Sequence, residues 1–310
     1  MKKVLMILAA ICMTMAANAK ILRVSNVSGS SAPYKSIEAA QDAASAGDTI
    51  MVEGSKTTYG DAYGYGAITL TKRVVLIGPG YWLAENGIIN EGGSAAVVGD
   101  LTIKVSNTVI KGMTTRDIEI NASHVVINRC QVTGGISFAE GADNAIISQN
   151  FIKGNIGRGN GYVTNYHQIT NNILTDVESN QNYSTINRIN DCTVAYNTFR
   201  DKTTKLSLTN SKIDHNIWKS YVEHGSSNNL SNNYEIDIIN TQATNDFIDT
   251  NYYNLEIPAE VISQYGAFAG DSPYVISGVP SGPIITDLEM PTTVEVGSTP
   301  TVTIKVSISK

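Results

Sequence analysis

The six residues ISQNFI at 147–152 are one copy of a pattern that recurs along the second half of the chain. In each copy an apolar residue is followed three positions later by Asn or Cys, and then by more side chains suited to a strand. The copies are INRCQV (127–132), ISQNFI (147–152), ITNNIL (169–174), VAYNTF (194–199), IDHNIW (213–218) and LSNNYE (230–235). Their fourth positions are 130, 150, 172, 197, 216 and 233, which gives intervals of 20, 22, 25, 19 and 17 residues. This period is too short for a pair of helices and matches one coil of a β-solenoid.

Alternating apolar residues predict strands with one buried face, and Gly, Asn and Asp are typical of the corners between them. An inward Asn at each fourth position would bond to the equivalent Asn one coil away and form an amide ladder. We also expect an apolar row beside this ladder, formed by Val132, Ile152, Leu174, Phe199 and Trp218.

The N-terminal end of the repeat is preceded by a helical pattern. Residues 36–45 predict a short helix with Ser36 as N-cap and with Ile37 and Ala40 on one face, and Gly47 follows it. Such a helix would cover the open end of a solenoid, which otherwise exposes its apolar core.

Taken together, SIEAAQDAASAGDTIMVEGSKTTYG (36–60), ITLTKRVVLIGPG (68–80) and the repeated coils resemble right-handed parallel β-helix proteins of the pectin-lyase-like type. The tail AFAGDSPYVISGVPSGP (267–283) is similar to exported Bacteroides-type β-helix proteins. The resemblance implies an all-β fold, a right-handed parallel β-helix with an N-terminal capping helix and a short C-terminal β tail. We expect the β-helix domain over 20–266, with residues 267–310 as a β tail along the solenoid or a small appendage.

The first nineteen residues have the features of a signal peptide. Lys2 and Lys3 precede an apolar run at 4–15, and Ala17 and Ala19 frame a small-x-small cleavage site. The run is too short to span a bilayer, and no second apolar run follows it. We therefore expect cleavage near Ala19 and a secreted, periplasmic or cell-surface protein with no membrane span.

Charge and cysteine content limit the partners and cofactors. A net charge of −6 argues against nucleic acid, which needs clustered Lys and Arg. Cys130 and Cys192 lie three coils apart, about 14 Å along the axis and beyond disulfide reach. No zinc spacing or EF-hand loop is present. Residues 240–254 permit weak Ca²⁺ binding or a solvated connection, and we favour the connection and a monomer without a cofactor.

The longest coils locate the candidate site. The coils that end at Asn172 and Asn197 are 22 and 25 residues long against 17 for the shortest, so the inserts at 153–167 and 175–191 should form one wall. Exposed tyrosines stack on sugar rings, and Arg suits an acidic sugar. The candidate substrate-binding residues are Tyr162 and Tyr183 in this wall, and Tyr59, Tyr63 and Tyr65 in the loop at 55–67. Ordinary solvated loops, with the tyrosines packed back onto the solenoid, are the alternative.

Eliminative cleavage of a uronic-acid polysaccharide needs a group that neutralises the carboxylate and a base that removes a proton. Arg158 or Arg188 could do the first, and His167 or Tyr166 the second. His167 aligns with inward-facing positions, so we favour a core or corner histidine. Glycoside hydrolysis needs two carboxylates at a defined separation, and no pair on adjacent coils stands out.

The segment SKIDHNIWKS (211–220) contains weaker catalytic candidates. In register, Lys212 and Asp214 face outward, and Trp218 joins the buried row. His215 takes a corner position that we expect to accept any polar residue, since other coils place Arg129, Gln149, Asn171 and Tyr196 there.

Two functions remain open from the sequence. The first is an exported carbohydrate-active protein, a polysaccharide lyase-like enzyme acting on an acidic polysaccharide. The second is a non-catalytic glycan-binding or surface solenoid. The missing catalytic set favours binding, whereas the resemblance and the clustered inserts favour an enzyme.

Overall fold

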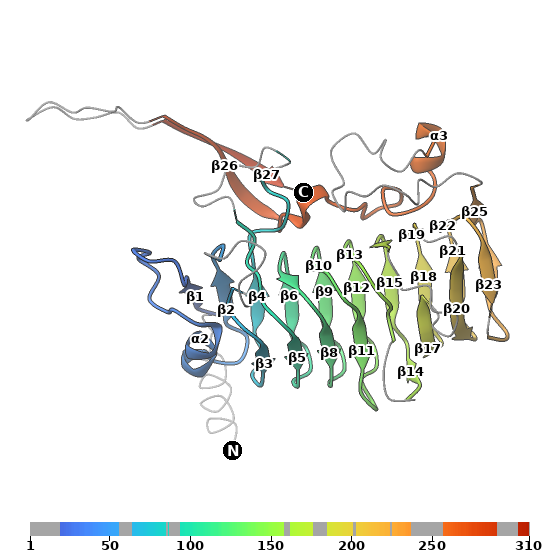
Figure 1. Cartoon of the computed structure of the whole chain (residues 1–310), viewed down its shortest axis with the longest axis horizontal. Coiled ribbons are helices and arrows are strands. Elements are labelled where there is room, and N and C mark those ends of the chain that lie inside the picture. The colour runs from blue at the N-terminus through green and yellow to red at the C-terminus, as the bar shows by residue number, and fades with distance from the viewer. Residues whose placement is uncertain are drawn as a thin grey trace, which may run out of the picture.

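The protein is all-β, with few helices and with most of its strands stacked in parallel along its length (Figure 1). The computed structural model describes residues 19–55, 64–84, 86, 94–157, 162–175, 185–200, 203–223, 225–236, 257–289 and 303–309. The expected signal peptide lies outside these residues except for Ala19. Within the described part of the chain, no helix has the length and apolarity to cross a membrane.

The largest sheet, sheet A, has ten parallel strands that follow one another in chain order. They are β1 (Ile21–Val24), β2 (Thr49–Val52), β4 (Val75–Ile77), β6 (Val109–Lys111), β9 (Val126–Asn128), β12 (Ile146–Ser148), β15 (Gln168–Thr170), β18 (Thr193–Ala195), β21 (Lys212–Asp214) and β24 (Asn229–Ser231). Ile147 pairs with Ile127 on one side and Ile169 on the other, so the repeated motifs lie in register.

A second sheet, sheet C, has seven short strands. They are β7 (Thr114–Thr115), β10 (Gln131–Val132), β13 (Phe151–Ile152), β16 (Ile173–Leu174), β19 (Thr198–Phe199), β22 (Ile217–Trp218) and β25 (Tyr234–Glu235). Two residues separate each of these from the preceding strand of sheet A, which makes the corner between the two sheets tight.

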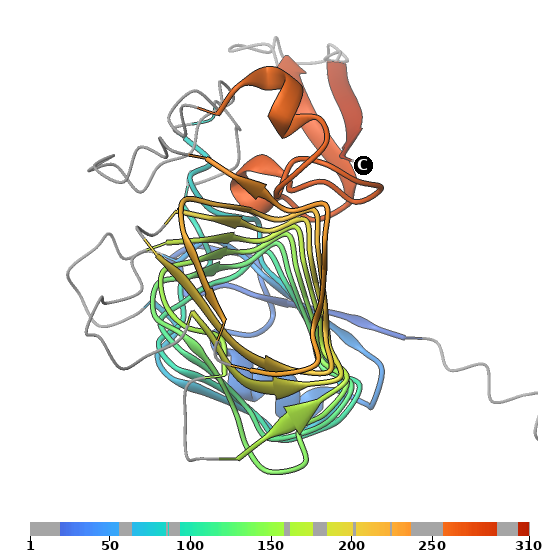
Figure 2. The same ribbon diagram turned by 90° about the vertical axis from the view of Figure 1, so that its right-hand side faces the viewer.

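The third side, sheet B, is formed by two groups of four strands. The first is β3 (Ile68–Leu70), β5 (Leu101–Ile103), β8 (Ile118–Ile120) and β11 (Ile136–Phe138); the second is β14 (Thr164–Asn165), β17 (Ile186–Asn190), β20 (Thr204–Thr209) and β23 (Tyr221–Glu223). Isolated bridges of Ile156 to Ile136 and Ile186 connect the groups. From β6 to β23 each coil thus supplies one strand per side, an arrangement consistent with a parallel β-solenoid (Figure 2).

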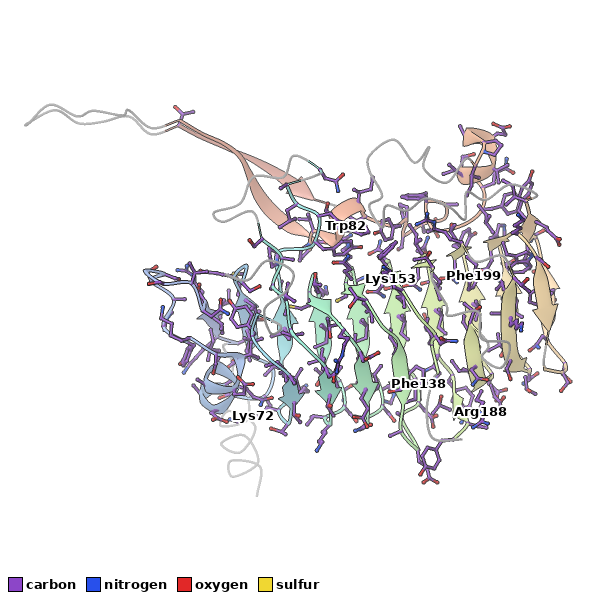
Figure 3. All side chains as sticks on the ribbon, viewed as in Figure 1. Lys72, Trp82, Phe138, Lys153, Arg188 and Phe199 are labelled. Atoms are coloured by element: carbon purple, nitrogen blue, oxygen red, sulfur yellow. The ribbon has the colours of Figure 1, made fainter. Side chains whose placement is uncertain are left out.

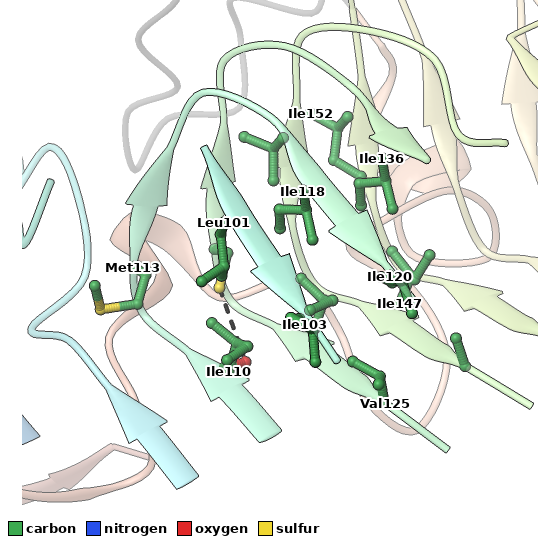
Figure 4. Packing of buried hydrophobic residues seen from close by; sticks show 14 of the residues in the cluster. Leu101, Ile103, Ile110, Met113, Ile118, Ile120, Val125, Ile136, Ile147 and Ile152 are labelled. Carbon is green, nitrogen blue, oxygen red and sulfur yellow. Dashed lines mark hydrogen bonds between the residues drawn. The ribbon is translucent and has the colours of Figure 1, made fainter. Parts of the chain in front are cut away.

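The interior is a continuous apolar core that runs from Leu22 to Trp218. Figure 4 shows how side chains from successive coils stack on one another, for example Leu101, Ile118 and Ile136. All five residues of the predicted apolar row are buried: Val132, Ile152, Leu174, Phe199 and Trp218. Cys130 and Cys192 are free and buried, the arrangement that the coil spacing predicts.

The predicted asparagine ladder is present. Backbone N–H groups donate to the side-chain Oδ1 of the asparagine one coil later at 2.8–3.0 Å, from Cys130, Asn150, Asn172, Asn197 and Asn216. The side-chain amide of Asn172 donates to Asn197 Oδ1 and also to the carbonyl of Ile147. Every rung therefore satisfies buried polar groups of two neighbouring coils.

Both corners beside sheet A contain residues in the left-handed region, where side chains other than Gly and Asn are uncommon. At the A–C corner, between sheets A and C, the φ angles are 52–57° for Arg129, Gln149, Asn171, Tyr196 and His215. At the B–A corner, between sheets B and A, they are 50–62° for His124, Asn144, Tyr166, Asp191 and Asn210.

A short helix, α2 (Ile37–Ala43), forms where the sequence predicts one and packs against β1, β2 and β3. Ser36 accepts a hydrogen bond from the Ala39 amide and is the N-cap. Ile37 and Ala40 are buried in the core cluster. This face of the helix therefore joins the first coils.

The C-terminal part of the chain returns along the outside of the solenoid. We call residues 257–281 the strap; it contains α3 (Ala259–Ile262) and the 3₁₀ turn at Ile276–Gly278, and it runs back over sheet C (Figures 1 and 2). An antiparallel pair, β26 (Gly282–Glu289) and β27 (Thr303–Ser309), follows it. The strap lies along the solenoid, and the two strands project from it.

Candidate functional site

The strap gives the A–C corner a structural role. Arg129 Nη1 donates to the carbonyl of Val279 at 2.8 Å, and Gln149 Nε2 donates to that of Pro273 at 2.6 Å. Asn171 Nδ2 donates to the carbonyls of Ala267 and Ala269 at 3.1 and 2.8 Å. These corner side chains are buried. At three of the five corner positions the side chain therefore donates to a strap carbonyl, a constraint that the sequence pattern did not predict.

An apolar layer beneath the strap completes its attachment. Phe151 and Ile173 point away from the solenoid core but are fully buried against Tyr81, Ala267 and Tyr274. Trp82, labelled in Figure 3, stacks edge-on against Phe151 at 4.7 Å. This second core was not predicted from the sequence. The signal for it was two adjacent apolar pairs, Phe151–Ile152 and Ile173–Leu174, because neighbouring residues of a strand face opposite sides and one of each pair must face outward.

Asp214 faces outward as expected, but it is buried rather than free. Its carboxylate accepts from Lys212 Nζ at 2.9 Å and from Ser231 Oγ at 2.8 Å, and His215 Nδ1 lies 3.0 Å from it. Burial raises the pKa of Asp214, but its contacts with Lys212, Ser231 and His215 outweigh it and hold the pKa at about 2. Asp214 is therefore a fixed anion that organises the corner.

The His215 ring lies between two tyrosines. Its centroid is 4.7 Å from that of Tyr196 and 5.8 Å from that of Tyr265, which belongs to the strap. The backbone of Gly266 donates to the carbonyl of His215 at 2.8 Å. Both faces of the imidazole are thus covered, and the residue clamps the start of the strap. The catalytic candidates Lys212, Asp214 and His215 are together in space, but they serve this attachment.

His167 is buried, in the inward position that its alignment predicts. The Ala145 amide donates to Nδ1 at 3.0 Å, and Nε2 lies 2.9 Å from Thr164 Oγ1. Burial lowers the pKa of His167 to about 4, although Asp143 acts in the opposite direction. With both nitrogens engaged and no exposed edge, the imidazole cannot reach a substrate directly.

Tyr65 also belongs to the fold rather than to a surface. The residue is buried, and its hydroxyl donates to the carbonyl of Glu53 at 2.9 Å and accepts from the Asn26 amide at 3.3 Å. Burial raises the pKa of this phenol. Tyr65 is therefore unsuited to stacking on a sugar. Arg158, Tyr59, Tyr63 and Tyr183, and the segment 240–254, lie outside the described residues.

The remaining candidates gather on the outer face of sheet B where its second strand group begins. β14 pairs with β17, so that Thr164 lies opposite Ile189 and Asn165 opposite Asn190. This pairing confirms that the two long coils are neighbours and brings Tyr162 and Tyr166 beside β17. We call Tyr162, Tyr166 and Arg188 the β14–β17 surface.

Each member of this surface is exposed. The exposed fraction is 45% for Tyr162 and 58% for Tyr166. Arg188 lies at a β-bulge, where the register of β17 with β20 shifts between Asn187 and Ile189. A bulge re-aims one side chain and is common beside functional sites. Figure 3 shows Arg188 on the side of the solenoid away from the strap.

Two residues of this surface have a strained backbone. Tyr166 and Arg188 have φ angles of 62° and 56°, which are unfavourable for bulky side chains. The strain at Tyr166 belongs to the B–A corner, because the exposed His124 has the same conformation two coils earlier. Arg188 differs in that it lies within strand β17, at the bulge. The strained and exposed arginine is therefore the more distinctive of the two.

Arg188 supplies the positive charge of this surface. Lys205 on the adjacent strand β20 is in register with Thr185, three positions before Arg188. The nearby carboxylates are used within the fold: Asp143 accepts from the Asn165 amide at 2.7 Å, and Asp191 accepts from Asn210. Among the described residues, no group of three or more His, Cys, Asp or Glu side chains is arranged to hold a metal ion.

No protein-family model matches the chain, and comparisons with curated proteins and with solved structures likewise find no match.

Proposed function

We propose that the chain is an exported right-handed parallel β-helix of the pectin-lyase-like type that binds an acidic polysaccharide on its β14–β17 surface. In this proposal α2 caps the N-terminal end of the solenoid, and the leader directs the protein to the periplasm, the cell surface or the medium. The observation that carries the proposal is the exposure of two tyrosines, which flank strand β14, and of a bulged arginine on its partner strand β17.

The chemistry of these groups matches such a ligand. The flat faces of Tyr162 and Tyr166 can stack on pyranose C–H surfaces, and the phenol hydroxyls can bond to sugar hydroxyls. The Arg188 guanidinium can bind a sugar carboxylate through two parallel N–H donors. Asn187 and Asn190, which flank the bulge on β17 and are partly exposed, add amide groups suited to hydroxyls. A neutral polymer would leave the arginine without a partner.

Binding is tested by affinity electrophoresis of the protein in gels that contain polygalacturonate, alginate or a neutral galactan. We expect retardation by at least one acidic polymer and none by the galactan. Tyr166→Ala should abolish most of the retardation. The matched control is His124→Ala, because His124 is exposed and left-handed at the same corner two coils earlier. Mobility that is equal in all three gels would contradict the proposal.

Charge recognition is tested separately with Arg188→Gln. This variant should lose the preference for acidic over neutral polymers, because the guanidinium supplies the carboxylate contact. Arg116→Gln serves as the control, since Arg116 is exposed but interacts with Asp100 on earlier coils. An unchanged preference in Arg188→Gln would remove the arginine from the proposed site.

Eliminative cleavage is the second candidate function, favoured by the presence of Tyr166 and Arg188 on paired segments. Arg188 would neutralise the uronate carboxylate, and the Tyr166 side chain in its ionised form would accept the C5 proton. The phenol so formed would pass this proton to the leaving oxygen as the C4–O bond breaks. Cleavage creates a C=C bond that absorbs in the ultraviolet, so turnover is read directly. Tyr166→Phe retains the stacking ring and removes the phenol; it should keep binding and lose cleavage. If absorbance does not change with any uronic-acid polymer, cleavage is excluded and binding remains as the proposed function.

A further inference from the structure

Tyr166 lies in a tight turn at 164–167 whose two ends are joined by side chains. Thr164 Oγ1 and His167 Nε2 are 2.9 Å apart, so a hydrogen bond closes the turn beneath the Tyr166 backbone. Among the described residues, Tyr166 is held through its main chain, where its amide donates to the carbonyl of Asn190 at 3.1 Å. The direction in which its ring projects therefore depends on the turn.

His167 also fixes this turn to the preceding coil. The Ala145 amide donates to Nδ1 at 3.0 Å, and the ring stacks on Phe138 at a centroid distance of 4.3 Å and an interplanar angle of 19°. Only 1% of the residue is exposed. The side chain acts as a strut between Tyr166 and the core.

The contacts of the strut are part of a second, shorter ladder. In the same column of the solenoid, the Cys192 amide donates to Ser211 Oγ at 3.1 Å, and the Ser211 amide donates to Asn228 Oδ1 at 2.9 Å. In each case a side chain receives the backbone N–H one coil back. Only at the His167 rung does the same side chain also close the turn that carries an exposed aromatic residue.

We propose that His167 is the positioning residue of the polysaccharide site: it holds Tyr166 in its left-handed, outward position without touching the ligand. This inference rests on the proposed function of the β14–β17 surface. It also makes binding sensitive to protonation of a side chain that lies inside the solenoid.

The hydrogen bonds define the active protonation state. Because the Ala145 N–H donates to Nδ1, this nitrogen must be unprotonated, and Nε2 carries the hydrogen that Thr164 accepts. A second proton on Nδ1 would oppose the Ala145 N–H and open the turn. Asp143 is the charged group that acts on the imidazole, and its own carboxylate accepts from the Asn165 amide. The other contacts, Phe138, Ala145 and Thr164, are uncharged.

Two variants separate positioning from packing. His167→Phe keeps the ring stacked on Phe138 and loses both hydrogen bonds, whereas His167→Asn keeps an acceptor close to the place of Nδ1. We expect His167→Phe to weaken polygalacturonate binding at pH 7 about tenfold, a typical effect for loss of a well-placed aromatic contact. His167→Asn should recover most of the affinity. Equal affinity of His167→Phe and wild type would overturn the proposal.

The double variant His167→Phe/Tyr166→Ala gives a readout that general destabilisation would not produce. If His167 acts through Tyr166, the double variant should bind no more weakly than Tyr166→Ala alone. Additive losses would show a separate effect and contradict the inference. In a pH series, the ratio of wild-type to His167→Phe affinity should shrink toward pH 4, because protonation of His167 then removes the bond from the Ala145 amide in the wild type. Titration of the ligand affects both proteins equally and cancels in this ratio.

A ligand-independent measurement distinguishes failure of this inference from failure of the proposed function. Amide hydrogen exchange at residues 164–168 should rise in His167→Phe at pH 7 and stay near wild-type values in His167→Asn. If the wild type binds none of the polymers, the proposed function fails whatever the exchange shows. If exchange in His167→Phe matches the wild type, the positioning role fails whatever the binding shows.

Discussion

The hydroxyls of Tyr81 and Tyr274 lie 2.6 Å apart although 193 residues separate them in the chain. Tyr81 follows β4 near the start of the solenoid, and Tyr274 belongs to the strap. The Tyr81 amide also donates to the carbonyl of Ser277 at 2.8 Å. Since the strap begins beside His215, it connects the last coils with the first and resists their separation.

The tyrosine pair predicts a coupled loss of stability. Tyr274→Phe leaves the buried Tyr81 hydroxyl without its partner, which should cost about 2 kcal/mol in the free energy of unfolding. The reverse change, Tyr81→Phe, should cost a similar amount. The double variant should lose less unfolding free energy than the two single variants together, because neither hydroxyl is then left unpaired. Urea unfolding of the four proteins measures this, and strictly additive losses would show that the hydroxyls are uncoupled.

The amide ladder predicts a position-dependent cost. Asn172→Ala removes a rung with partners on both sides, Asn150 and Asn197, and strands buried N–H and C=O groups. We expect a loss of about 3 kcal/mol. Asn233→Ala is the matched control at the end of the ladder, where the residue is partly exposed and water can replace its amide. Similar losses at both positions in urea titrations would be inconsistent with a ladder of buried bonds.

Asp214 predicts an acid-dependent component of stability. Its folded pKa of about 2 is below the ordinary value of 3.8, so its contribution is complete above pH 4 and is lost as the pH falls toward 2. The shift corresponds to about 2 kcal/mol at neutral pH. Asp214→Asn should be less stable at pH 7 and should lose less of its remaining stability between pH 4 and pH 2. Parallel pH profiles for the two proteins would exclude this role.

The two thiols predict protection in the folded state. Burial raises the pKa of Cys130 to about 12 and that of Cys192 to about 11. Because the thiolate is the reactive form, the native protein should react very slowly with a disulfide reagent at pH 8. Both thiols should react within the mixing time in denaturant. Rapid native labelling, located by mass spectrometry, would show which part of the core opens.

The repeat predicted the interior of the fold because one inward position per strand and one Asn per coil define a coil completely. Ile147, Asn150 and Ile152 are enough to place their coil in register. The path of the strap could not be predicted in the same way. Its contacts join Arg129 to Val279 and Asn171 to Ala267, pairs without a shared period and formed through backbone carbonyls that any residue supplies.

The neighbouring arrangement of the two long coils was predicted, but their detailed geometry was not. Coil length located the neighbouring inserts, and β14 pairs with β17 as expected. The bulge at Arg188 and the turn closed by His167 depend on backbone geometry that local composition does not encode. At His215 the sequence places an acid, an imidazole and an ammonium close together, but it gives no sign of the two tyrosine rings that stack on the imidazole.

The two corners beside sheet A have a consequence for how this protein could change. Sheets A and C and the corner between them are almost constant in length from coil to coil, whereas the segment that contains sheet B absorbs the variation between 17 and 25 residues. Insertions on that side leave both ladders intact. Loops on the sheet B side can therefore change in length and sequence, and with them the ligand that is bound. Sheets A and C and the strap need not change.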